Sequence, residues 1–231
     1  MGTEELVAVP GGTSAGASLR TPRSAAVAGI AFSVLLGAVF LLLHLSVPVT
    51  GVTSSNWVTD AHRRDAVSPA LGLVPFAGIA FLWFVGVIRD RIGALEDRFF
   101  ATVFLGSGLL FVAMVFVGAA AVGGLLSDPA LRSGTPTDSA LWDLQRRVAL
   151  TLINTYAIKM AAVFIFSTTT IGMRTGLLPR WLTVAGFAAG LVLLFGSSVT
   201  AWMNLVLPVW AFVLSVDILV RNRRLQNASA S

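Results

Sequence analysis

The sequence contains no cysteine, and this absence excludes several classes of site at once. Disulfides, thiol nucleophiles, cysteine-ligated zinc, iron–sulfur clusters and covalently attached c-type haem all need that side chain. Charged residues are also scarce: they make up 12% of the 231 residues, against about 25% in an average soluble domain. Hydrophobic residues reach 56%. The composition therefore predicts a chain whose solvent is the lipid bilayer.

The net charge of +5 does not indicate nucleic-acid binding. All but one of the basic residues are arginines, and they stand at the ends of apolar runs. This distribution is typical of charge that flanks a membrane, and it differs from a phosphate-binding stripe. We therefore expect the lipid bilayer as the surrounding medium and no nucleic acid as a partner.

The apolar runs predict an all-α fold, a polytopic bundle with six transmembrane spans of about 20 residues each. These spans are expected at about 24–45, 70–88, 99–126, 148–171, 181–199 and 202–220. The last two come from one apolar stretch, Trp181–Val220, which is too long for a single tilted helix and should fold as a hairpin around Gly196–Asn204. The transmembrane domain would thus cover 24–221. We expect a disordered tail at 1–23 and a short tail at 222–231.

Arginine counts predict the orientation of the bundle. With the N-terminus inside, ten arginines fall in cytoplasmic segments and five in outer loops. The inner arginines are Arg20, Arg23, Arg89, Arg91, Arg98, Arg174, Arg180, Arg221, Arg223 and Arg224, and the outer ones are Arg63, Arg64, Arg132, Arg146 and Arg147. The positive-inside rule therefore places both termini in the cytoplasm and the two longer loops outside. Pro75 and Pro208 are expected at the outer starts of spans two and six.

Small residues mark faces where helices can approach closely. Gly29, Ser33 and Gly37 are spaced by four in span one, and Gly186 and Gly190 are spaced by four in span five. These faces predict close packing within one bundle. A homodimer or a contact with another membrane protein through the same faces is the alternative.

The chain's only lysine, Lys159, stands inside the apolar run "TLINTYAIKMAAVFIF" (151–166). Arg147, Thr151, Thr155 and Lys159 are spaced by four and share one helix face. Lys159 would lie roughly 18 Å deeper than Arg147, close to the middle of the membrane. We expect this polar face to point into the bundle and the opposite face to contact lipid. The residues expected on the lipid side are Ile153, Ala157, Met160, Phe164 and Ile171.

Two interpretations of Lys159 stay open. In the first, a polar pocket descends from the outer face to the lysine amine, since ionisable groups inside membranes are enriched at functional sites. In the second, the lysine is structural and either bonds to carbonyls and hydroxyls or extends toward the surface. The candidate pocket residues are Lys159, Thr155, Thr151, Asn154, His44, Asn204 and Asp217.

The other polar residues give weaker indications of a functional site. Asp217 is the one carboxylate within a span, and Arg221 follows it by four residues, so an ion pair near the inner surface is expected. "DAHRRD" (60–65) offers imidazole and oxygen ligands, but its spacing matches no zinc pattern. We expect no metal, no cofactor and no catalytic residue. A b-type haem would need a pair of histidines inside the membrane, and a retinal Schiff base would need a counter-ion at the depth of the lysine. An intramembrane serine protease would need a serine with a histidine at matching depth, and an aspartyl protease would need two aspartates within spans. The predicted spans contain none of these sets.

Two stretches resemble a broad group of uncharacterised bacterial six-helix membrane proteins. They are "FLWFVGVIRDRIGALEDRFFATVFLGSGLLF" (81–111) and "LLPRWLTVAGFAAGLVLLFG" followed by "NLVLPVWAFVLSVDILVR" (177–221). The resemblance implies six spans in a bacterial plasma membrane, and it implies no activity.

Three functions are compatible with these patterns. The first is a non-enzymatic membrane protein with a polar pocket around Lys159, acting as a small-solute carrier, a sensor or an accessory subunit. The second is a membrane-embedded enzyme for a lipid-like substrate. The third is a structural subunit of a membrane complex.

Overall fold

The computed structural model describes residues 22–46, 61–92, 98–127, 139–196 and 201–230, and these residues are almost entirely helical. The α-helices are α1 (Pro22–Ser46), α3 (Ala61–Ile92), α4 (Arg98–Leu126), α6 (Ser139–Thr151), α7 (Ile158–Arg174), α8 (Arg180–Gly196) and α9 (Val206–Ala230). A π-helical turn, η2 (Leu152–Ala157), joins α6 to α7, and a 3₁₀ turn, η3 (Ala201–Leu205), leads into α9. The predicted all-α class is confirmed for the described residues.

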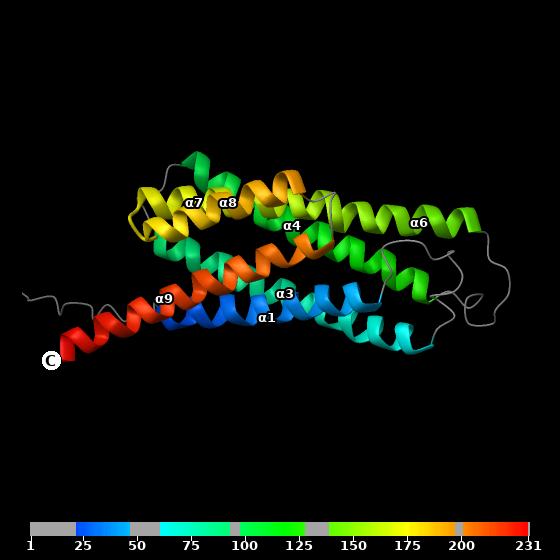
Figure 1. Cartoon of the computed structure of the whole chain (residues 1–231), viewed down its shortest axis with the longest axis horizontal. Coiled ribbons are helices and arrows are strands. Elements are labelled where there is room, and N and C mark those ends of the chain that lie inside the picture. Colours follow the sequence, from blue (N-terminus) through cyan, green and yellow to red (C-terminus); the bar gives the residue numbers. More distant parts are fainter. Residues whose placement is uncertain (1–21, 47–60, 93–97, 128–138, 197–200, 231) are drawn as a thin grey trace, which may run out of the picture.

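The helices lie side by side in two layers (Figure 1). In one layer α1 packs between α3 and α9, and in the other α7 packs between α4 and α8. The layers are joined along the seam between α3 and α4, whereas α8 and α9 make few contacts with each other. The pairs α1–α3, α3–α4 and α7–α8 thus join helices that follow one another in the chain, as short connections favour, whereas α9 packs mainly against α1.

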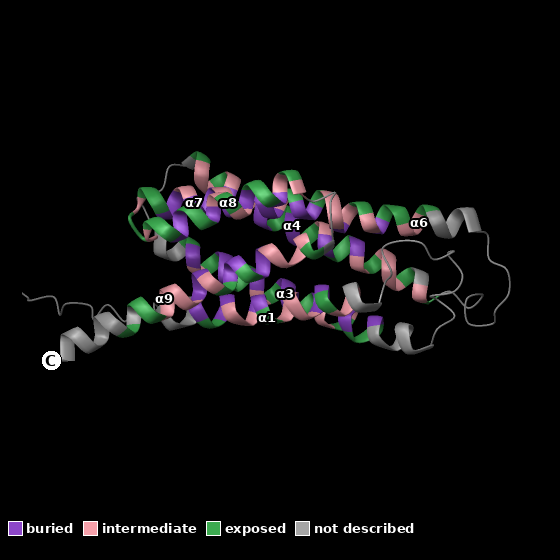
Figure 2. Cartoon of the chain, in the orientation of Figure 1, coloured by how far each residue is buried: buried purple, intermediate pink, exposed green. Residues whose placement is uncertain are grey.

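Buried residues gather where the two layers face each other (Figure 2), and the largest of them are phenylalanines. The ring of Phe81 on α3 lies 4.7 Å from that of Phe32, 5.3 Å from that of Phe111 and 5.0 Å from that of Phe164, measured between centroids. All four are buried and come from four different helices. Since lipid provides little hydrophobic drive for helix association, this tight contact between large side chains carries much of the packing energy.

Five of the described helical stretches are long and apolar enough to span a membrane, which fits a multi-pass membrane protein. The shorter apolar helix is α8, with 17 residues. It rises about 25 Å, somewhat less than the hydrocarbon thickness of about 30 Å.

Two expected boundaries differ from the structure. Pro75 does not begin a helix: α3 starts at Ala61, and both Pro69 and Pro75 lie inside it. A membrane helix tolerates internal proline because neighbouring groups and local adjustments satisfy the freed carbonyl. Pro208 does stand in the first turn of α9, as predicted. At the other end α9 continues to Ala230, through most of the expected C-terminal tail, while 1–21 and residue 231 lie outside the described residues.

The glycine faces pack within the chain. A Cβ on Gly29 of α1 would collide with Ser215 of α9 and stand 2.8 Å from the ring of Phe84. On α8, a Cβ on Gly190 would stand 2.8 Å from the ring of Phe166 on α7. This is the close packing within one bundle that the spacing predicts. Association with a second protein through the same faces stays a prediction.

Candidate functional site

The polar centre of the bundle is the π-helical turn between α6 and α7. Asn154 lies within this turn, and Asn204 donates from Nδ2 to Asn154 Oδ1 across 2.8 Å. Asn204 belongs to η3, so this hydrogen bond attaches the tip of the α8–α9 hairpin to the long α6–α7 helix. A π-turn interrupts the regular hydrogen bonding of a helix, and such turns occur often at functional sites.

Lys159 does not point into the bundle. Its side chain is exposed on the surface of the bundle, and so is that of Thr151. Four of the five residues assigned to lipid lie inside: Ala157 and Phe164 are fully buried, and Ile153 and Ile171 are nearly so. The fifth, Met160, is partly buried. The predicted orientation of span four is therefore wrong by about half a turn.

The glycines of α4 explain this orientation. A Cβ on Gly108 would stand 3.3 Å from the ring of Phe164, and one on Gly118 would stand 2.5 Å from the side chain of Ile153. Bulky side chains of the α6–α7 helix thus fit against α4 where it has no side chain, as small residues allow in membrane bundles. This fit turns the opposite, polar face outward.

Contacts with α8 set the level of Lys159. Phe166 packs against Gly190 and Thr169 against Gly186, so α7 and α8 run antiparallel. Extending this register brings Lys159 level with Gly196, the last residue of α8. Lys159 also follows Asn154 by five residues, which places it about 7 Å below the hairpin tip. The lysine is therefore close to the tip and to the carbonyl end of α8, where the helix dipole favours a cation.

The remaining predicted residues do not gather around Lys159. Thr155 is half-buried in the π-turn, and His44 belongs to α1, but its side chain lies outside what the structure describes. Asp217 Oδ2 lies 2.9 Å from Arg221 Nε, the ion pair that their spacing predicts. Of the candidate pocket residues, the structure brings Asn154 and Asn204 into direct contact. A functional role for the others stays a prediction.

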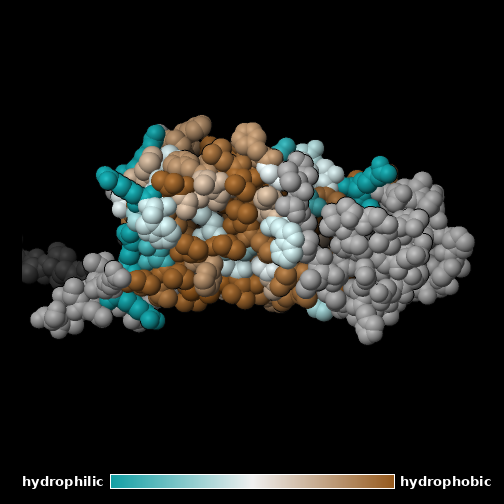
Figure 3. All heavy atoms as spheres, viewed as in Figure 1, coloured by the Kyte–Doolittle hydropathy of each residue, from teal (hydrophilic) through white to brown (hydrophobic). Residues whose placement is uncertain are grey.

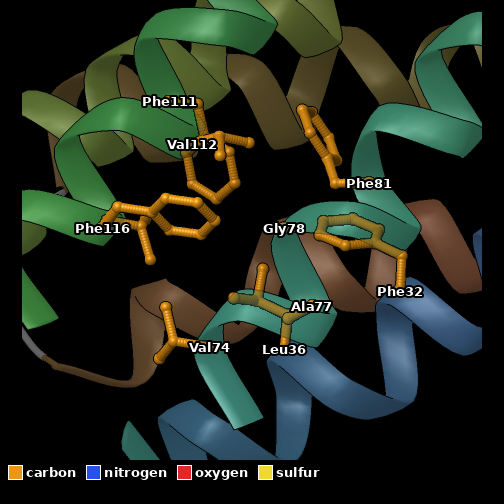
Figure 4. Close-up of a pocket in the computed structure, with 10 residues that line it drawn as sticks. Phe32, Leu36, Val74, Ala77, Gly78, Phe81, Phe111, Val112 and Phe116 are labelled. Carbon is orange, nitrogen blue, oxygen red and sulfur yellow. The ribbon is translucent and has the colours of Figure 1, made fainter. Parts of the chain in front are cut away.

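A cavity of about 10 Å³ lies between the layers, away from these polar residues (Figure 4). Phe32, Val74, Phe81 and Phe111 are among the apolar side chains around it. A cavity of this volume is just large enough for one water molecule. The lining offers no donor or acceptor to orient a polar ligand.

A second pair of buried polar side chains, Thr169 and Trp210, was not among the predicted residues. Thr169 on α7 and Trp210 on α9 are 0% and 5% exposed, yet Thr169 Oγ1 and Trp210 Nε1 lack a hydrogen-bond partner among the described residues. The sequence does indicate a polar site on α7, because "FSTTTIG" (166–172) places four hydroxyl residues in a row inside an apolar span.

The N-terminal end of the α6–α7 helix carries a third group. Gln145 donates from Nε2 to the carbonyl of Ala121 on α4 across 3.2 Å, and Ala149 is buried. The opposite side of α6 is exposed and forms what we call the α6 outer stripe: Leu144, Arg147, Val148 and Thr151. Arg146 stands beside it, and its Nε is buried with no hydrogen-bond partner among the described residues.

Comparison with known proteins gives no further guide. No protein-family model, no curated protein and no solved structure matches the chain. The resemblance to bacterial six-helix membrane proteins therefore stays a prediction, and function has to be inferred from the geometry.

Proposed function

We propose that the protein is a six-span membrane protein with both termini in the cytoplasm, and that it acts as an accessory or sensor subunit through the α6 outer stripe. The exposed arginines Arg174, Arg180 and Arg221 stand at the end of the bundle where α7 meets α8. The space-filling view shows hydrophilic side chains at this end and a hydrophobic belt beside them (Figure 3). By the positive-inside rule this end faces the cytoplasm.

The hairpin tip supports the position of the outer boundary. Trp202 at the tip and Tyr156 in the π-turn are 53% and 54% exposed, and such aromatic residues favour the membrane–water interface. From Arg174 to Asn154, which bonds to Asn204 at the tip, the helix rises about 30 Å, the thickness of the hydrocarbon. Lys159, about 7 Å below the tip, can then extend its flexible side chain to the headgroups.

The helices α3, α4 and α6 continue well past this boundary (Figure 1). The 13 residues of α6 rise about 20 Å above the π-turn, alongside the ends of α3 and α4. A Cβ on Gly123 of α4 would stand 3.7 Å from Leu71 of α3, and Gln145 of α6 donates to the carbonyl of Ala121 on α4, so the three ends pack together. We call this part the outer platform. On this placement the outer ends of the spans predicted at 99–126 and 148–171 lie beyond the membrane, because the helices are longer than the hydrocarbon is thick. The platform is then a folded surface that a partner could reach.

The single observation that carries the function is the α6 outer stripe. Leu144 and Val148 are 59% and 46% exposed, and they flank the exposed Arg147 on one helix face. Outside the membrane these apolar side chains would contact water unless a partner covers them. An amphipathic partner surface that carries a carboxylate would cover Leu144 and Val148 and pair with Arg147.

Site-specific photo-crosslinking in native membranes tests this proposal. We expect a probe at Leu144 to capture one protein, and Arg147→Glu to reduce this adduct at least tenfold because the charge pair becomes repulsive. A probe at Val184, 69% exposed on α8, serves as the control and should capture lipid. Capture of lipid at Leu144, an adduct within the chain, or an adduct indifferent to Arg147→Glu would each contradict the proposal.

A further inference from the structure

The hydroxyl of Thr169 behaves differently from those of the other buried serines and threonines that the structure describes. Six of these side chains donate to a carbonyl about one turn earlier in the chain, the usual way to satisfy a hydroxyl in a membrane helix. They are Ser33, Ser107, Ser167, Thr168, Thr183 and Ser215. Thr169 makes no such bond, so its hydroxyl is free for another partner.

The Thr169 hydroxyl lies beside Gly186 of α8, and the indole of Trp210 reaches the same point from α9. A Cβ on Gly186 would collide with Thr169 Oγ1 and would stand 3.1 Å from Trp210 Nε1. Two buried polar atoms from two helices thus converge on a residue that has no side chain. No other described group bonds to either atom.

The chemistry of the two atoms defines the ligand. An indole N–H can only donate, whereas a hydroxyl can both donate and accept. A buried polar group left unpaired destabilises the fold, and hydrocarbon supplies nothing to pair with it. The ligand must accept from Nε1–H, bond to Oγ1 and be small, since three helices surround it. We propose that the site holds one ordered water molecule that links α7 to α9 beside α8.

The position of this water gives it a structural consequence. The helices α8 and α9 make few contacts along their lengths. The Asn154–Asn204 hydrogen bond joins the hairpin to the α6–α7 helix at the outer end. The water would join α9 to α7 at a second point, nearer the other end of α7, so the seam between the two layers would be held at two levels.

Water-edited solid-state NMR of the full-length protein in lipid bilayers tests the proposal. Tryptophan is labelled with ¹⁵N, and Trp210→Phe identifies the indole signal of Trp210. We expect this buried indole to receive magnetisation from water in the parent protein and in Thr169→Ser, which keeps the hydroxyl. Thr169→Val, which has nearly the same shape without the hydroxyl, should lose the transfer.

Three results would overturn the proposal. The first is no transfer to the Trp210 indole in the parent protein, as expected for a dry site or for a direct bond between Trp210 and Thr169. The second is transfer that persists unchanged in Thr169→Val. The third is loss of transfer in Thr169→Ser, because a retained hydroxyl should keep the water.

Discussion

Replacement of Phe81 by alanine is expected to lower the free energy of unfolding by about 3 kcal/mol or more. The Phe81 ring contacts those of Phe32, Phe111 and Phe164, so its removal leaves a cavity at the point where both layers meet. It also borders the existing 10 Å³ cavity, which would enlarge. In a bilayer the lost transfer energy is small, but the lost van der Waals contacts are not replaced.

Phe76 provides the matched control for Phe81. It lies on the same helix, but it is 61% exposed on the bundle surface. Phe76→Ala should therefore change stability by less than about 1 kcal/mol. Reversible unfolding of both purified variants in mixed micelles, followed by circular dichroism, gives the two values. Equal losses would show that the rings of Phe32, Phe81, Phe111 and Phe164 do not form the packing centre.

Gly29→Ala is expected to destabilise the protein by about 1–3 kcal/mol, because the new methyl group has no room. It would collide with Ser215 of α9 and approach the Phe84 ring to 2.8 Å. Since α1 packs between α3 and α9, relief of this clash requires α1 to move away from one of them. The same unfolding measurement applies.

The control for Gly29 is Gly86 on α3, where a Cβ would meet nothing within 4 Å. Alanine has the better helix propensity, so Gly86→Ala should leave stability unchanged or raise it by about 0.4–1 kcal/mol. If both substitutions stabilised the protein, the close approach of α1 to α9 would be refuted.

Much of the architecture could be predicted from hydrophobic length. Long apolar runs identified the helical, membrane-spanning character, and glycine spacing identified Gly29, Gly186 and Gly190 as contact points. The π-turn at Leu152–Ala157 could not be foreseen, because no proline or glycine in "LINTYA" marks it. The partner of Asn154 in this turn could not be foreseen either, because Asn204 lies fifty residues away in the sequence.

The predicted orientation of Lys159 was wrong for a different reason. The spacing by four correctly placed Arg147, Thr151 and Lys159 on one face, but periodicity does not say which face points inward. That choice follows from the fit of Phe164 and Ile153 against Gly108 and Gly118 of α4, a contact between segments far apart in the sequence. Sequence periodicity defines faces, and packing between helices decides their direction.

The position of the outer membrane boundary at the hairpin tip is the central claim, and cysteine accessibility tests it most directly. The chain has no cysteine, so each introduced thiol reports alone. Ser68 and Leu191 are both exposed, the first on the outer platform but not in the α6 outer stripe, and the second on α8 below the tip. A membrane-impermeant maleimide added to intact cells should modify Ser68→Cys and spare Leu191→Cys. Protection of Ser68→Cys, or its modification only from the cytoplasmic side, would contradict the account.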